Sequence, residues 1–195
     1  MARIAGPGPQ SERADAARNR ARVLEAAAAL FAERDPATVT MDDIARRAGV
    51  GRATLYRRYP DRGAIAAALL GEHERVLQDA VLGGPPPLGP GAPAAARLEA
   101  FLLALAELHE RHGHLSLAIE TERRRLETGA HGAWRLHVEH LLGEAGVGAE
   151  RGALADQVLA AVSPSLLRFQ HERLGRPAAE IEAALRLLAG RVARP

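Results

Sequence analysis

The sequence predicts an all-α protein of about nine helices. Apolar residues recur every three or four positions through most of the chain, and no segment alternates apolar and polar residues in the way that predicts a strand. Glycine and proline interrupt the pattern where helices are expected to end. With 195 residues, 47% hydrophobic and 3% aromatic, the chain can form one large or two small domains around a core of leucine, alanine and valine.

Composition and charge exclude several functional classes. The chain has no cysteine, which excludes disulfides, thiolate chemistry and cysteine-type zinc sites. It has no apolar run of about 18 residues and no signal peptide, so we expect a cytoplasmic protein without a membrane partner. Residues 1–62 hold 12 arginines against 8 acidic residues, whereas residues 63–195 hold 14 against 16. The N-terminal part is therefore the part suited to a polyanion.

Residues 40–59 predict two short helices joined by a tight turn. Thr40 is the expected N-cap of the first helix, and Asp43, three residues later, completes a capping box. Gly49 is expected to end this helix in the left-handed conformation. Pro60 ends the second helix, because proline disfavours helical geometry in the residue before it.

The second of these helices, residues 52–58, predicts a surface that reads DNA. Leu55 is expected to anchor it on the first helix, which leaves arginines, hydroxyls and one methyl group on the other faces. Such groups bind the phosphates and base edges of double-stranded DNA, and a helix-turn-helix presents them on its second, recognition helix. The alternative is an ordinary helical hairpin with solvated arginines.

The run TMDDIARRAGVGRATLYRRYPDRGAI resembles the DNA-binding signature of TetR-family transcriptional regulators. The likeness lies in the GV pair, the Thr-Leu-Tyr triplet, the aromatic Tyr59 and the basic Arg62. Two positions depart from the family pattern: Gly51 stands where serine is frequent, and Tyr59 stands where phenylalanine is usual. The candidate DNA-binding residues are Thr40, Gly51, Arg52, Ala53, Thr54, Tyr56, Arg57, Arg58 and Arg62.

The resemblance also implies a role for each contact. It implies that Thr54 and Tyr56 bind backbone phosphates, and that Arg52, Ala53 and Arg58 face bases or phosphates in the groove. It further implies a homodimer in which a small molecule bound to a second domain changes the position of the recognition helix.

The chain is expected to divide into an arm and two domains. Residues 1–14, rich in glycine and proline, are expected to be a disordered arm. Residues 15–60 form the helix-turn-helix DNA-binding domain, in which Arg22 faces either phosphate or solvent. Residues 61–195 form a helical ligand-binding and dimerisation domain, and residues 61–82 are its connecting helix.

The last helices predict a homodimer. Helices expected over 151–174, kinked at Pro164, and over 177–191 carry more apolar surface than one monomer needs. Pairing with their twins in a four-helix bundle would bury it, and the two recognition helices would then read a palindromic operator. The expected interface residues are Leu154, Leu159, Val162, Leu166, Ile181, Leu185 and Leu188.

The second domain is expected to bind a small, mostly apolar effector, which suits a helical bundle with few inward polar groups. Trp134 and His137 are the best placed, one turn apart on one face of an expected helix. The alternative for each candidate is a plain core position. The candidate ligand-binding residues are Leu105, His109, Glu122, Trp134, His137, Leu141 and Phe169.

Two other functional classes are weighed against this one. A metal-sensing regulator could use His109, His112 and His114, or His137 and His140, but zinc needs three or four converging ligands. A helical enzyme is the third class, and the sequence has no nucleophile elbow, phosphate loop or recognisably spaced acid pair. We therefore expect no metal, no cofactor and no catalysis, and a repressor released from its operator by a small molecule.

Overall fold

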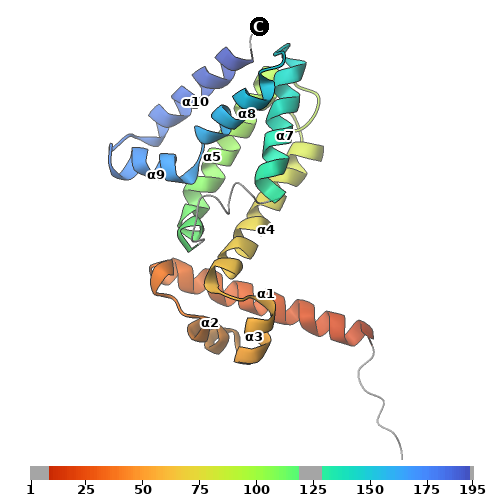
Figure 1. Ribbon diagram of the computed structural model, residues 1–195, viewed down its shortest axis with the longest axis vertical. Helices are drawn as coiled ribbons and strands as arrows, with labels where there is room; N and C mark the ends of the chain where they lie inside the picture. Colours follow the sequence, from red (N-terminus) through yellow and green to blue (C-terminus); the bar gives the residue numbers. More distant parts are fainter. Residues whose placement is uncertain (1–8, 119–128, 194–195) are drawn as a thin grey trace, which may run out of the picture.

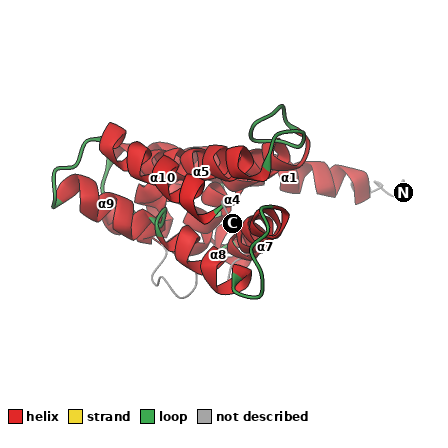
Figure 2. Ribbon diagram, turned by 90° about the horizontal axis from the view of Figure 1, so that it is seen from above, coloured by secondary structure: helices red, strands yellow, loops and turns green. Residues whose placement is uncertain are grey.

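The computed structural model describes residues 9–118 and 129–193 (Figure 1). Within these ranges it consists of nine α-helices and one short 3-10 helix, without strands, so the predicted all-α class is confirmed (Figure 2). The elements are α1 (Pro9–Glu33), η1 (Pro36–Thr38), α2 (Met41–Ala48), α3 (Arg52–Arg58), α4 (Arg62–Gly83), α5 (Ala94–Ala118), α7 (Gly129–Glu144), α8 (Arg151–Ala160), α9 (Pro164–Glu172) and α10 (Ala178–Val192).

Helices α1, α2 and α3 form a small domain at one end of the molecule, and α4 leads from it into a bundle of α5 and α7–α10 (Figure 1). Helix α5 is central to the bundle, with α4, α7, α9 and α10 packed against it. Helix α4 also packs against α1 and therefore contacts both parts. Buried apolar side chains form one cluster that runs through both parts. No helix in the described ranges is long and apolar enough to cross a membrane.

The N-terminal helix is longer than the sequence analysis predicts. Helix α1 begins at Pro9, so residues 9–14 are helical, and the expectation of a disordered arm is wrong for them. Residues 1–8 of that arm lie outside the described residues. Proline suits a first helical turn, because the N–H group that it lacks would have no partner within the helix.

The sequence predicts that one helix ends near Gly113 and that another covers about 115–128. Instead, α5 passes through Gly113 and runs to Ala118, and residues 119–128 lie outside the described residues. A single glycine costs a helix only about 1 kcal/mol, an amount that packing of the flanking turns overrides.

Pro164 begins a helix instead of kinking one. The single helix expected over 151–174 is two helices, α8 and α9, and the side chain of Ser163 caps α9 by accepting the N–H of Leu166 at 3.4 Å. Serine followed by proline is a signal for a helix start, because serine caps and proline fits the first helical position. The restart changes which residues face the core after position 163.

Candidate nucleic-acid interface and effector site

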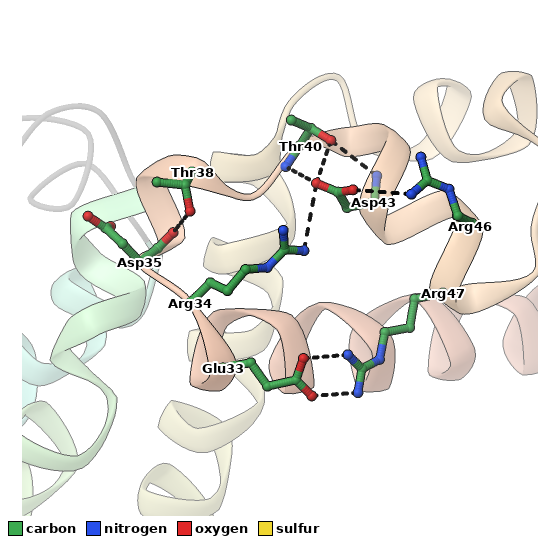
Figure 3. A network of polar contacts seen from close by, with 8 residues as sticks. All are labelled: Glu33, Arg34, Asp35, Thr38, Thr40, Asp43, Arg46 and Arg47. Atoms are coloured by element: carbon green, nitrogen blue, oxygen red, sulfur yellow. Dashed lines mark hydrogen bonds and ion pairs between the residues drawn. The ribbon is translucent and has the colours of Figure 1, made fainter.

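A complete capping box begins α2. The backbone N–H of Asp43 donates to the hydroxyl of Thr40 at 3.1 Å, and the backbone N–H of Thr40 donates to the Asp43 carboxylate at 3.2 Å (Figure 3). The hydroxyl of Thr40 also donates to this carboxylate, and these hydrogen bonds hold the pKa of Asp43 below its ordinary value. The predicted cap is therefore present, and a DNA contact by Thr40 stays a prediction.

Ion pairs fasten α2 to α1. The guanidinium of Arg47 donates two hydrogen bonds of 2.6 Å to the carboxylate of Glu33, and Arg34 lies 3.7 Å from Asp43 (Figure 3). The pairing with Arg47 lowers the pKa of Glu33. These ion pairs hold the first helix of the motif against α1.

The turn between α2 and α3 favours glycine because its backbone is left-handed. Gly49 has a φ of 60°, and the N–H of Val50 donates to the carbonyl of Ala45 at 3.1 Å, which closes the end of α2. In addition, the guanidinium of Arg22 donates to the carbonyl of Gly49 at 3.1 Å, and a Cβ at this position would lie 2.5 Å from that guanidinium. Arg22 therefore supports the turn, a role that the sequence did not indicate, and a phosphate contact by Arg22 stays a prediction.

Helix α3 turns one residue inward and its other side chains outward. Leu55 is buried and anchors the helix, and Tyr59, which follows it, is buried too. Tyr56 is 47% exposed. Gly51 provides no side-chain cap, as expected for a residue without a hydroxyl. The exposed residues of α3 are Arg52, Ala53, Thr54, Tyr56, Arg57 and Arg58.

A cleft of about 460 Å³ separates α3 from the N-terminal half of α1. Asn19 and Arg20 line it from α1, and Thr54, Arg57 and Arg58 line it from α3. The arginines and the hydroxyl of Thr54 suit a phosphate backbone, whereas Asp15 adds a carboxylate to the wall formed by α1. Arg52, outside this cleft, forms an ion pair with Asp42 of α2. The predicted side chains of α3 are thus exposed, and their contacts with DNA stay a prediction.

Helix α4 is tied to the small domain at two places. Asp61 caps it by accepting the N–H of Ala64 at 2.8 Å, which places Arg62 at its first turn, directly after the recognition helix. Arg20 of α1 donates to Glu72 of α4 at 2.5 Å, and this hydrogen bond raises the pKa of Arg20. Helix α4 is therefore in direct contact with the domain that carries α3.

The structure brings several of the predicted effector residues together between α5 and α7. Leu105, Trp134 and Leu141 are buried, and the ring of Phe101 lies 5.5 Å from that of Trp134 and 5.0 Å from that of His137. Phe101 is not among the predicted effector residues, although its place among the regularly spaced apolar residues of α5 indicated that it faces the core. Burial, together with the positive charge of Arg97, lowers the pKa of His137 to about 4.

Two of the other predicted effector residues, His109 and Phe169, have different surroundings, and the third, Glu122, is outside the described residues. His109 is buried, and its Nδ1 lies 2.7 Å from the carbonyl oxygen of Val162, which is a structural contact. Phe169 is 50% exposed, because the restart of the helix at Pro164 puts Leu167 into the core instead, and its role in effector binding stays a prediction.

Most of the predicted dimer-interface residues are buried within the monomer, and the interface itself stays a prediction. Leu159, Val162, Ile181 and Leu185 are buried within the monomer, where α8 packs on α7 and α10 packs on α5. Leu154 and Leu188 are half-buried, and Leu166 alone of the seven is exposed. The apolar side chains that are exposed on or beside these helices are Leu166, Phe169, Leu174 and Leu187.

The histidines do not form a metal site in the described part of the chain. No group of three or more histidine, cysteine, aspartate or glutamate side chains there could hold an ion. His73 of α4 and His112 of α5 stack with 3.7 Å between ring centroids and 11° between ring planes. Each imidazole lone pair lies in its own ring plane, so two parallel rings cannot share one ion. The side chain of His114 is outside the described residues.

Acid is expected to destabilise the protein through His137. Its pKa of about 4 in the folded chain lies below the roughly 6.5 of an exposed histidine, so the unfolded chain binds more protons between these values. The contribution of neutral His137 to the free energy of unfolding is fully present above about pH 6.5 and is lost as the pH falls towards 4. We expect the Tm to fall over this interval, and to fall less in His137→Gln. An equally steep fall in the wild-type protein and in His137→Gln would contradict the assignment.

Taken together, the capped turn, the anchored second helix and its exposed cations define a helix-turn-helix DNA-binding protein. Residues 23–69 match the family described as bacterial regulatory proteins, tetR family. The match covers the whole of α2 and α3 with parts of α1 and α4.

Curated relatives match the same part of the chain. An uncharacterised HTH-type transcriptional regulator of Mycobacterium tuberculosis strain H37Rv is 46% identical over 56 residues, which are 29% of this chain and 28% of that protein. One of Mycobacterium bovis is 45% identical over 64 residues, 32% of this chain and 34% of that protein. The chain thus aligns with only about a third of these relatives' length.

Solved structures extend the likeness of fold to most of the chain. A TetR transcriptional regulator from Rhodococcus sp. RHA1 has a TM-score of 0.60 at 21% identity, over 89% of this chain and 94% of that one. A gamma-butyrolactone receptor described as ArpA-like has a TM-score of 0.51 at 20% identity, over 92% and 98%. Residues 23–69 thus match the DNA-binding region of the TetR family, and most of the chain has the fold of solved TetR regulators.

Proposed function

We propose that the protein is a homodimeric transcriptional repressor that binds a palindromic operator and is released by a small-molecule effector. It acts in the cytoplasm by binding, without catalysis. The observation that carries the proposal is α3, a helix anchored by one buried leucine with every other side chain exposed. The family match over residues 23–69 supports the same reading.

The operator experiment tests this proposal directly. Fluorescence anisotropy would measure the affinity of the protein for DNA upstream of its own gene and for scrambled DNA, across a salt series. We expect tight binding to the operator that weakens steeply with salt, because arginines that neutralise phosphates release counterions. Equal, weak binding to the upstream DNA and to genomic fragments of other origin would contradict a sequence-specific repressor.

The hydroxyl of Tyr56 is expected to bind a phosphate. Tyr56→Phe should weaken binding about tenfold on operator and scrambled DNA alike, because a hydrogen bond to a charged group is lost without loss of base readout. Tyr59→Phe is the matched control, since Tyr59 is buried behind the same helix. A loss confined to the operator would instead assign base readout to Tyr56.

Arg52 is expected to read a base. In the free protein its guanidinium is paired with Asp42, so DNA binding would exchange a surface ion pair of small value for contacts in the groove. Arg52→Ala should reduce discrimination at individual base pairs by about 1–3 kcal/mol, the value of a bidentate contact with guanine. Binding to a panel of operator variants measures this. Equal losses on every sequence would make Arg52 a phosphate contact only.

A second copy of the chain is the partner that we propose for the outer faces of α9 and α10. On α10 the side opposite the buried Ile181 and Leu185 carries Ala183, Leu187 and Gly190. A Cβ added at Gly190 would meet nothing in the monomer, and Leu187 is 62% exposed. A face of small and apolar residues is suited to close packing against another helix.

Helix α4 is the proposed relay between effector and operator. It packs against α5 and α7 in the bundle and against α1 in the small domain, where Glu72 holds Arg20. An effector that favours a different position of α4 would change the spacing of the two recognition helices. The coupling of about 1–3 kcal/mol must be reciprocal, so the effector should weaken operator binding as much as the operator weakens effector binding. Unequal shifts in the two titrations would contradict this relay.

A further inference from the structure

Three buried nitrogens without hydrogen-bond partners lie along the seam between α5 and α7. They are Nε of Arg97, Nε1 of Trp134 and Nε2 of His137, and none has a partner within the described part of the chain. Buried polar groups are almost always paired, so unpaired groups that gather in one place call for an explanation. These lie among the residues that the sequence already marked as effector candidates.

Contacts across the seam place the three groups close together. Phe101 of α5 touches both the Trp134 and the His137 rings of α7, with centroid distances of 5.5 Å and 5.0 Å. Arg97 lies one turn before Phe101, and its Nη1 donates to Glu144 at 3.2 Å on the same side of α7. Trp134 and His137 are themselves one turn apart. The unpaired nitrogens therefore follow one stretch of the α5–α7 contact.

The chemistry of these groups defines what they lack. The indole nitrogen and the guanidinium nitrogen can only donate, and a neutral imidazole can donate from one nitrogen. Arg97 adds a positive charge, and burial together with this charge lowers the pKa of His137. The seam is lined by apolar side chains, since Leu105, Val138 and Leu141 are all buried. The missing partner is an oxygen acceptor, preferably anionic, on an apolar body.

We propose that the effector is an apolar small molecule with a carboxylate, whose oxygens accept hydrogen bonds from Trp134, His137 and Arg97. This rests on the proposed function, since it names the ligand class of the same regulator. The carboxylate would replace no hydrogen bond within the protein, because these nitrogens have none to lose. The remaining apolar part would lie against the leucines of α5 and α7.

Trp134 is the only tryptophan in the chain, so intrinsic fluorescence reports on this seam alone. The probes are decanoate, 1-decanol and decylamine, which share one chain and differ in head group. We expect a saturable change in emission with decanoate, at least tenfold weaker binding of decanol, and weaker binding still of decylamine, whose head group is a cation. An equal response to the three probes would overturn the proposal, because it would show apolar binding without head-group recognition.

Matched arginine variants test the charge directly. Arg97→Gln should weaken decanoate binding at least tenfold and leave decanol binding unchanged. Arg135→Gln is the control, because Arg135 lies on α7 but pairs with Asp156 and Glu139 away from the seam. Unchanged decanoate affinity in Arg97→Gln, with circular dichroism showing a folded protein, would overturn the assignment.

Operator binding and decanoate binding are measured independently, so the ligand class and the repressor function can fail separately. Decanoate binding at Trp134 is measured without DNA, and operator binding is measured without decanoate. Operator binding with no discrimination among the probes would overturn the ligand class and leave the repressor intact. Decanoate binding that depends on Arg97, with no specific DNA binding, would support the site and contradict the repressor.

Discussion

Replacement of Phe101 by alanine is expected to lower the free energy of unfolding by about 3–5 kcal/mol. Phe101 is fully buried on the central helix of the bundle and holds the rings of Trp134 and His137 against α5. Its removal leaves a cavity where α5 meets α7, and the rigid helices on both sides cannot close it. Urea titration followed by far-ultraviolet circular dichroism, at a fixed protein concentration, measures the change.

Leu136→Ala is the control for this prediction. Leu136 lies on α7 close to the same contact but is 64% exposed, so its truncation should change the free energy of unfolding by no more than about 0.5 kcal/mol. Equal effects of the two substitutions would show that α5 and α7 do not pack as described.

The helix-turn-helix could be predicted from the sequence because its determinants are local. Thr40 and Asp43 cap one another three residues apart, and Gly49 closes the turn through its own backbone. The anchoring of α3 by Leu55 depends on neighbours only a few positions away. The hydrogen bond from Arg22 to the carbonyl of Gly49 could not be predicted in the same way. The two residues are 27 positions apart, and their contact depends on how α1 packs against the turn.

The bundle was harder to predict because its helices are apolar on more than one side. Periodicity located the stripes of α8 and α10 but could not distinguish packing within the chain from packing against a second copy. Leu159 and Leu185 turned out to face the core of the monomer. The Ser163–Pro164 start of α9 was visible in the sequence, yet an unbroken pattern of apolar residues favoured one long helix. The stacking of His73 on His112 joins two helices and has no sequence signal at all.

The substitution Phe169→Glu is expected to convert the dimer into monomers. Phe169 is 50% exposed on the outer side of α9, one turn from the exposed Leu166, and a central aromatic residue of an interface is worth about 2–4 kcal/mol. A buried, unpaired carboxylate adds a further cost. Sedimentation velocity over a range of concentrations would show a dissociation constant raised by at least about thirtyfold, since each 1.4 kcal/mol is a factor of ten.

Val76→Glu is the matched control, since Val76 of α4 is 63% exposed and lies outside the proposed interface. It should leave the dimer intact. Operator affinity should fall in Phe169→Glu only, because a monomer presents one recognition helix and loses the gain from binding two half-sites at once. A Phe169→Glu protein that remains dimeric would assign the dimer to another face.

The same glutamate at a buried position of α10 distinguishes an interface residue from a core residue. Leu185 faces α5 inside the monomer, so Leu185→Glu should unfold the bundle, with loss of helical circular dichroism. Phe169→Glu should dissociate the dimer and keep its helical signal. A folded monomer from Leu185→Glu would mean that α10 is available to a partner on its inner side, as the sequence alone suggested. The contrast between the two substitutions therefore decides which side of the last helices is used for dimerisation.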